Sequence, residues 1–356
     1  MNELIINIKD LEHNISVIKS LESENYTIIS VVKGNAYGCS LKEYVDVLKK
    51  FDINFFAVAS YKEALEFRKY FDDKLLLLTP YSDKQIISDL IEKDIIFTIE
   101  SKEQAKVIEK YAKKEVHAHI KVDTGLNRYG FKFDDVNSII DTIKETKKIK
   151  YDGIYSHFSN SLAKDSSFSE LQYKRFIDVI DVLKSEKIEF KLKHICNSSG
   201  YFKYSKMHLN AARIGSAFIG LATGIDTDLK KIGMYHTQIV KIMNIKKGEY
   251  VGYAKSFKAK ENKTLAVLPC GYFDGIGKTL IDQRFSFKSK VKKVLLDTRN
   301  IFKTDYHKIS DLNIIGQIGM HDVVVDITGK DYKLNDDLYF YYKPSLIDTS
   351  VKRVFK

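Results

Sequence analysis

The sequence is poor in the residues that mark flexible linkers and disulfide-bonded scaffolds. Its 356 residues include only three prolines and 18 glycines, which leaves little room for a disordered linker. The three cysteines, Cys39, Cys196 and Cys270, are odd in number and far apart, so neither a disulfide framework nor a zinc pattern fits them. These shortages favour a reducing, cytoplasmic setting and predict no bound metal.

Long apolar runs are also missing. No stretch approaches the roughly 18 apolar residues of a membrane helix, and the first residues, MNELIINIKD, do not resemble a signal peptide. We therefore expect no membrane segment within this chain. This expectation fits an intact protein, and it equally fits the soluble part of a longer one.

A basic stripe is absent too, although the net charge of +11 raises nucleic acid as a partner. The lysines are interleaved with acidic residues, as in YKEALEFRKYFDDK. This pattern indicates a solvated lysine-rich surface, so we expect no nucleic-acid partner.

Up to about residue 220, the chain alternates β-rich apolar runs with helical, charged segments such as LKEYVDVLKKF. Near-continuous apolar strands separated by helices are typical of parallel sheets. A doubly wound open sheet is the alternative, but eight successive units favour a closed barrel. The runs are IISVVKG (28–34), NFFAVAS (54–60), LLLLTP (75–80), IIFTIES (95–101), VHAHIKVDT (116–124), YDGIYSHF (151–158), FKLKHICNSS (190–199) and LNAARIGSAFIG (209–220).

The pattern changes after about residue 225. Strand-like runs such as KTLAVLPCGYFDG and DVVVDITG follow one another with short turns and no helices between them. The fold class predicted is therefore α/β, a (β/α)8 TIM-type barrel over residues 7–222, followed by a mainly β domain over residues 223–356. Residues 1–6 are a candidate added strand of that second domain.

In such a barrel, active residues follow the carboxyl ends of the strands. The predicted strand ends carry a dense polar set, and so many polar residues at one edge indicate a site rather than chance. The set is Lys33, Asn35, Tyr37, Lys121, Asp123, Arg128, His157, Asn197, Ser198, Arg213, Gly215 and Ser216.

Lys33 is the most informative of these residues, because it follows the first hydrophobic strand in IISVVKGNAYGCS. A lysine in surroundings of low polarity loses its proton more easily, and its neutral amine attacks carbonyl groups. The alternative is a lysine whose long side chain simply reaches water, and the residue alone leaves both open.

Several motifs, in order along the chain, resemble the alanine racemase family. VVKGNAYG resembles the family's pyridoxal-phosphate signature, VVKANAYG, and KVDTGLNRYG resembles its K-x-D-T-G-M-x-R-L-G segment. Matches continue with YSHFSNS, CNSSG and NAARIGSAFIG, and in the β domain with VGYAKSF, PCGYFDGIG and GQIGMHDVVVD.

The resemblance implies that pyridoxal 5'-phosphate binds covalently to Lys33 and that Arg213, supported by His157, faces its pyridine nitrogen. It implies that Arg128 contacts both cofactor and substrate, and that Lys121 matches a lysine carbamylated in some members. The full cofactor-binding set is Lys33, Tyr37, Arg128, His157, Asn197, Ser198, Arg213, Gly215 and Ser216.

The resemblance also implies a two-base racemisation, with Lys33 on one face of the α-carbon and Tyr253 of a partner subunit on the other. The implied assembly is a head-to-tail homodimer with shared active sites. Further substrate-binding residues would be Met320, Tyr272 and Thr349, beside Arg128. Alanine is the default substrate, and D-alanine for peptidoglycan is the implied purpose.

Two departures bear on the substrate. The family's Cys-Met-Asp is here Gly319-Met320-His321, and the shortened C-terminus places Thr349 where many members have a tyrosine. A shorter side chain leaves more room, so serine or a larger amino acid is the alternative substrate.

Two alternative functions are less compatible with the sequence. One is a pyridoxal-phosphate carrier protein with a related barrel, but such proteins lack the β domain. The other is a fold-related decarboxylase, but such enzymes normally carry an acid where Arg213 stands.

Overall fold

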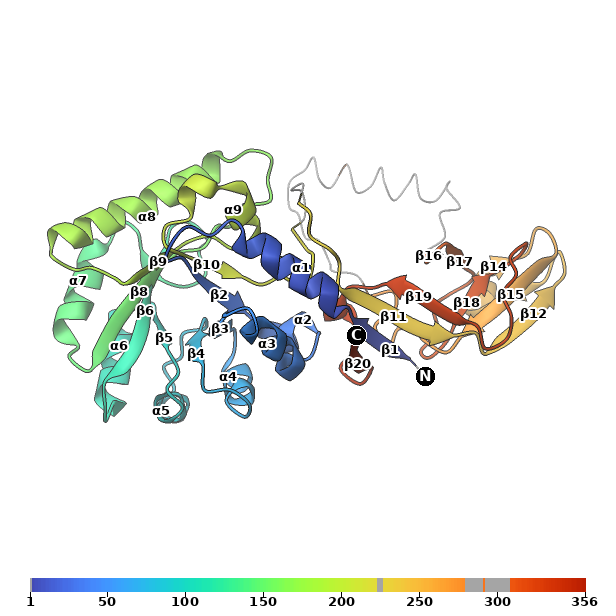
Figure 1. Ribbon diagram of the computed structural model, residues 1–356, viewed down its shortest axis with the longest axis horizontal. Helices are drawn as coiled ribbons and strands as arrows, with labels where there is room; N and C mark the ends of the chain where they lie inside the picture. Colours follow the sequence, from blue (N-terminus) through green and yellow to red (C-terminus); the bar gives the residue numbers. More distant parts are fainter. Residues whose placement is uncertain (1, 223–226, 279–290, 292–307) are drawn as a thin grey trace. The chain divides into compact units, whose positions relative to one another are not determined.

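The computed structural model describes residues 2–222, 227–278, 291 and 308–356. The chain divides into two compact units, and Figure 1 shows both. One unit comprises residues 8–232, and the other comprises residues 1–7 together with residues 233–356. No helix within the described ranges is both long and apolar enough to cross a membrane.

Parallel strands of the first unit form a nearly closed barrel in the order β4-β3-β2-β10-β9-β8-β6-β5. A parallel bridge between Leu76 and Ile96 links β4 to the segment before β5. The predicted α/β barrel is thereby confirmed over the described residues. Its strands are β2 (Thr27–Val31), β3 (Phe55–Val58), β4 (Lys74–Leu77), β5 (Phe97–Ile99), β6 (Val116–Asp123), β8 (Ile149–Tyr155), β9 (Leu192–His194) and β10 (Ala211–Ile214), and β7 (Phe131–Lys132) pairs with β6.

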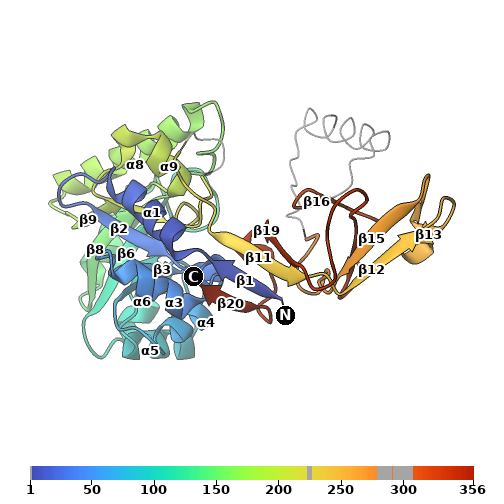
Figure 2. The same cartoon turned by 45° about the vertical axis from the view of Figure 1, so that its right-hand side comes forward.

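Helices separate these strands along the chain, and α3 to α6 lie along the outer side of the strands in Figures 1 and 2. Polar caps fix where several of them begin: Ser60 accepts from Glu63 N, and Ser101 accepts from Gln104 N. The helices are α1 (Ile8–Lys19), α3 (Leu41–Lys49), α4 (Tyr61–Phe67), α5 (Lys84–Glu92), α6 (Lys102–Tyr111), α7 (Val136–Glu145), α8 (Ser167–Ser185) and α9 (Ser198–Lys203).

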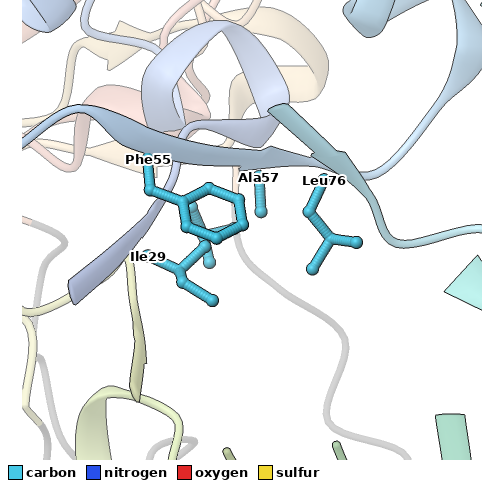
Figure 3. Close-up of a cluster of buried hydrophobic side chains, with 5 residues drawn as sticks. Ile29, Phe55, Ala57 and Leu76 are labelled. Carbon is cyan, nitrogen blue, oxygen red and sulfur yellow. The ribbon is translucent and has the colours of Figure 1, made fainter. Parts of the chain in front are cut away.

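One group of strands contributes an apolar cluster to the core of the unit. Ile29 and Val31 of β2 pack with Phe55 and Ala57 of β3 and with Leu76 of β4, as Figure 3 shows for the labelled residues. All of them are buried, so this cluster fixes the mutual position of the three strands by hydrophobic burial. The strand end that precedes Lys33 is therefore anchored.

The second unit consists mainly of antiparallel sheets, as the sequence predicted. β1 (Glu3–Ile6) pairs antiparallel with β11 (Gly233–Gln238) and parallel with β20 (Lys352–Phe355), and β19 (Asp337–Tyr341) completes that sheet. A further sheet contains β12 (Lys241–Ile245), β15 (Lys263–Leu268), β18 (Val323–Asp326), β17 (Leu312–Ile314) and β16 (Lys308–Ile309), and β13 (Tyr250–Val251) pairs with β14 (Phe257–Lys258).

In the structure the barrel unit continues to residue 232, whereas the sequence analysis ended the barrel at residue 222. Buried Asn14 of α1 explains the difference. Its amide donates to Phe218 O at 2.9 Å and to Lys230 O at 2.7 Å, and its carbonyl oxygen accepts from Lys230 N at 2.7 Å. These bonds attach the segment after the last barrel strand to α1, so that segment belongs to the barrel unit.

Candidate active site

A cavity of about 290 Å³ lies at the carboxyl ends of the barrel strands. The structure brings together there every barrel residue that the sequence analysis assigned to cofactor binding, together with Lys121. It also adds residues that were not predicted, of which Tyr155 is the most buried. The lining consists of Val31, Lys33, Tyr37, Leu78, Lys121, Arg128, Tyr129, Tyr155, His157, Asn197, Ser198, Ser199, Arg213, Gly215 and Ser216.

The charge of this lining is one-sided. Lys33, Lys121, Arg128 and Arg213 contribute cations, and none of the lining residues that the structure describes is an aspartate or glutamate. Crowded cations without acids repel one another, and a bound anion would relieve that repulsion. The cavity is therefore suited to an anionic ligand.

Lys33 starts α2 (Lys33–Tyr37), which is a left-handed turn rather than an ordinary helix. Gly34, Asn35, Ala36 and Tyr37 all have φ between 52° and 64°. Left-handed backbone costs a non-glycine residue roughly 1–2 kcal/mol, so such a run persists only where its surroundings hold it. The turn places both Lys33 and Tyr37 at the cavity.

Glu63 of α4 provides much of that hold. One carboxylate oxygen accepts from Gly34 N at 2.6 Å, while the other accepts from Ala59 N at 2.9 Å and from Ser60 N at 3.1 Å. The same residue completes the capping box of α4. Glu63 thus joins the Lys33 turn to the adjacent helix of the barrel.

The amine of Lys33 has its pKa lowered, chiefly by the protein atoms that surround it and secondly by the cation of Arg128. The carboxylate of Glu63 opposes this shift. A lowered pKa raises the fraction of neutral, nucleophilic amine. The side chain of Lys33 is itself exposed, so this amine combines a lowered pKa with access to solvent and ligands.

Arg213 is a buried cation whose partners are all uncharged. Its Nη2 donates to Ser156 O at 2.7 Å and to His157 Nδ1 at 3.0 Å, and its Nη1 donates to His194 Nδ1. The ring of Tyr155 lies 4.7 Å from the guanidinium carbon and adds a cation–π contact. Among the described residues, none accepts a hydrogen bond from its Nε–H.

The arginine fixes the protonation of both histidines. Arginine can only donate hydrogen bonds, so Nδ1 of His157 and of His194 must be acceptors, and each ring carries its hydrogen on Nε2. Burial, followed by the charge of Arg213, lowers the pKa of both imidazoles well below the usual value. Both rings are therefore neutral, and the Nε2–H of His157 is a donor at the edge of the cavity.

Lys121 lies beside this network. Its amine donates to Val122 O at 2.9 Å and lies 5.2 Å from the ring centre of Tyr155. Burial first, and the cation of Arg213 second, lower the pKa of Lys121 to about 7. A substantial fraction of this amine is neutral near physiological pH, although no carboxylate accepts from it in the described chain.

A second group of residues forms a cradle of donors. The hydroxyl of Ser198 accepts from Gly215 N at 3.0 Å and from Ala217 N at 3.2 Å, which leaves its own hydrogen free to donate. A Cβ at Gly215 would lie 2.3 Å from the hydroxyl of Tyr37, so only glycine fits there. Burial raises the pKa of Tyr37 to about 12, and its hydroxyl stays protonated.

Two of the polar strand-end residues serve the loops instead. The side chain of Asn35 accepts from Leu41 N at 2.8 Å, and Asp123 accepts from three successive backbone N–H groups and from Lys132. Neither of them lines the cavity. Asn35 and Asp123 therefore shape the cavity rim without entering it.

The remaining predicted residues lie in the β unit. Tyr253 is 76% exposed, Tyr272 and Met320 are each 48% exposed, and Thr349 is exposed as well. Backbone bonds link the segments of the last three, since Tyr272 N donates to Gly319 O and Asp348 N donates to Asp274 O. A Cβ at Gly252, next to Tyr253, would lie 3.3 Å from Gln317 N. These exposed side chains thus come from adjoining loops.

Comparison with known proteins places this architecture in a family. The model of the alanine racemase N-terminal domain matches residues 6–223, and that of the alanine racemase C-terminal domain matches residues 233–350. The chain belongs to the alanine racemase family. The family resemblance inferred from the sequence motifs is confirmed, and the chain is thereby a member of a family of isomerases.

Individual members of the alanine racemase family give the same result. The alanine racemase of Helicobacter pylori (strain P12) is 33% identical over 290 residues, which cover 77% of each chain. That of Clostridium tetani (strain Massachusetts / E88) is 30% identical over 344 residues, or 94% of this chain and 84% of the relative. The solved alanine racemase of Clostridium difficile 630 shares the fold, with a TM-score of 0.85 at 23% identity over 100% of this chain and 95% of its own.

Tyr155 is the cavity residue that sequence reasoning missed most clearly. It lies two residues before His157, and side chains two apart along a strand share a face. The alternation within YDGIYSHF could therefore have identified it. His194 was missed as well, and its position two residues after Leu192 on β9 gave a weaker signal.

We predict that Glu63→Ala destabilises the barrel unit and disturbs the Lys33 turn. Removing one carboxylate that accepts from three backbone N–H groups should lower the free energy of unfolding by about 1–3 kcal/mol. Urea denaturation measures this change. Glu66→Ala on the same helix is the control, because Glu66 is a surface carboxylate that pairs with Lys69 and Tyr70, and its loss should cost less than about 0.5 kcal/mol. Equal effects of the two variants would contradict the proposed hold on the turn.

Proposed function

We propose that this protein is a pyridoxal-phosphate-dependent alanine racemase that interconverts L- and D-alanine. One observation carries the proposal: a lysine with a lowered pKa shares a cationic cavity, whose described lining contains no carboxylate, with a charged arginine held by neutral histidines. Membership of the alanine racemase family supports the reaction and its substrate. The absence of an acid from the described lining disfavours the decarboxylase alternative, in which an acid would face the pyridine nitrogen.

The residues present fit pyridoxal phosphate. The cofactor carries a phosphate, an aldehyde carbon and a pyridine nitrogen, and when bound it withdraws electrons from the bonds at the amino acid's α-carbon. Lys33 offers an amine of lowered pKa for the aldehyde. The Ser198 hydroxyl, the Tyr37 hydroxyl and the backbone at Ser216 offer donors for the phosphate.

Arg213 suits the pyridine nitrogen because its Nε–H is unclaimed by the described residues. An arginine keeps its proton, so the nitrogen that it contacts stays largely unprotonated. We assign to Arg128 the binding of the cofactor's phenolic oxygen and the substrate carboxylate, and its place in the cavity lining supports this role. These assignments follow the family resemblance, and the burial and hydrogen bonding of Arg213 support them.

Racemisation requires proton transfer on both faces of the α-carbon. We assign one face to the amine of Lys33 and the other to the hydroxyl of Tyr253 of the partner subunit. Tyr253 is highly exposed within its own unit, so it is available to a neighbouring chain. The proposal therefore includes a head-to-tail homodimer with shared active sites. Tyr272, Met320 and Thr349 would border the substrate, with serine the alternative to alanine.

The first prediction concerns Tyr253→Phe. Purified protein with pyridoxal phosphate should racemise alanine faster than serine or lysine, and this variant should lower kcat by about 10²–10⁴-fold because one base is gone. In deuterated water it should still exchange the α-hydrogen of one enantiomer only. Tyr250→Phe, a half-exposed tyrosine close by in sequence, is the matched control and should keep its activity. Preferred turnover of serine would make Thr349 the specificity element, and no turnover at all would refute the proposal.

The second prediction tests the shared sites. Lys33→Ala and Tyr253→Phe chains should each be inactive alone, whereas the purified heterodimer should recover about half of the wild-type kcat, since one of its two sites receives both native residues. Tandem affinity purification from co-expressed, differently tagged chains isolates this species. An inactive heterodimer would show that both bases come from one chain.

The third prediction concerns carbamylation of Lys121, in which a neutral amine adds to carbon dioxide and releases one proton. The pKa of Lys121 is lowered to about 7, so the neutral fraction rises as pH increases through that value. Carbon NMR with labelled carbon dioxide at constant partial pressure should show a carbamate signal that grows between about pH 6 and about pH 8.5. Lys121→Ala should lack the carbamate signal. A wild-type protein without this signal would refute carbamylation of Lys121.

A further inference from the structure

His119 is a buried histidine that neither the proposed chemistry nor the family motifs use. It lies on β6, two residues before Lys121, and is only 1% exposed. Its ring lies 5.9 Å from that of Phe55, at the edge of the apolar cluster of β2 to β4. The interior therefore holds a polar ring against an apolar wall, which calls for a specific hydrogen-bonding role.

The backbone around His119 is shaped to admit this ring. The pairing of β6 with β8 shifts register between Ala118 and His119, which marks a β-bulge or similar irregularity. Opposite His119, a Cβ added to Gly153 would lie 2.6 Å from Nδ1 and 2.7 Å from two further ring atoms. A glycine and a local irregularity thus make room for one imidazole.

The hydrogen bonds of this ring have a fixed direction. Arg213 donates to Nδ1 of His194, so the hydrogen of His194 is on Nε2. That Nε2 lies 3.0 Å from Nδ1 of His119, which must therefore accept, and His119 in turn carries its hydrogen on its own Nε2. Each link donates away from the active-site cavity, in the order Arg213, His194, His119.

We propose that His119 is a positioning residue: it accepts from the Nε2–H of His194 and thereby keeps His194 as the hydrogen-bond acceptor that orients Arg213. The role of Arg213 toward the cofactor rests on the proposed function, but the direction of hydrogen-bond donation from Arg213 through His194 to His119 does not. Without an acceptor, the buried N–H of His194 would be unsatisfied, and ring orientations that release Arg213 would compete. Linked hydrogen bonds also strengthen one another in a buried setting.

The last donor of this hydrogen-bond series, Nε2–H of His119, lies next to a second cavity. His119 lines a second cavity, of about 870 Å³, formed at the amino ends of the strands by residues that include Thr27, Phe55 and Lys74. No described residue accepts from the Nε2–H of His119, and water in this cavity can do so. Burial lowers the pKa of His119 to about 3, so the ring stays neutral and its donor pattern does not change at ordinary pH.

Nitrogen NMR of isotope-labelled histidine in the holoenzyme tests the direction of these hydrogen bonds, because it reports which ring nitrogen carries the hydrogen. For His194 and for His119 we expect a protonated Nε2 and an unprotonated Nδ1, with signals assigned by single substitutions. A protonated Nδ1 on either ring would overturn the proposal, whether or not the protein racemises alanine. Normal signals without any turnover would instead count against the proposed function alone.

Variants at His119 test its consequence for Arg213. His119→Leu removes the acceptor, and we expect about a tenfold or greater loss in kcat with KM changed less than about twofold, together with a shifted visible band of the bound cofactor. His119→Asn places an amide oxygen near the position of the lost Nδ1. It should restore most of the wild-type kcat and the wild-type visible band of the cofactor. His117→Asn is the control, because His117 is exposed and pairs with Asp152. Unchanged kcat and cofactor spectrum in a folded His119→Leu variant would overturn the proposal.

Discussion

The charge of Arg213, buried without a carboxylate partner among the residues that the structure describes, is the constraint on which the site depends. A buried cation is costly to desolvate, and most proteins pair it with an acid. Here carbonyl oxygens, two neutral imidazoles and the face of Tyr155 share that task. An acid would neutralise the guanidinium locally, whereas these partners leave its charge available to the cavity. The histidines must consequently stay neutral, and their burial beside Arg213 ensures this.

The same cation shapes the other ionisable groups of the cavity. After burial, the charge of Arg213 contributes most to lowering the pKa of Lys121. For Lys33, the charge of Arg128 does so. Four cationic side chains around one small cavity disfavour one another's protons, so the lysines become the groups that yield them. Burial is the larger cause of both shifts, and the neighbouring cations add to it. A phosphate, a carbamate or a substrate carboxylate would each offset part of the positive charge.

Much of this was accessible from the sequence. Eight apolar runs predicted the barrel, and the strand ends predicted all four cationic residues of the cavity and the hydroxyls of Tyr37, Ser198 and Ser216, because parallel strands bring their carboxyl ends to one edge. The hydroxyls of Tyr129, Tyr155 and Ser199 were not predicted. The left-handed turn at Gly34 to Tyr37 was not accessible, since Asn35 and Ala36 carry no signal that distinguishes it from an ordinary loop. The continuation of the barrel unit beyond residue 222 was not accessible either, since a single buried amide, Asn14, holds it through contacts more than 200 residues away in sequence.

The interior histidines show why strand-end reasoning is incomplete. His119 lies within β6 and His194 ends β9, and neither was among the predicted site residues. HIKVDT resembles any buried strand that happens to contain a histidine. Their role depends on a direction of donation that begins at Arg213 and can be deduced only once the atoms are placed. That direction also links the two ends of the barrel: a donor-only arginine at one cavity requires an acceptor at each successive ring, and the last hydrogen must reach solvent at the other cavity. The second cavity thus completes the hydrogen bonding of the first.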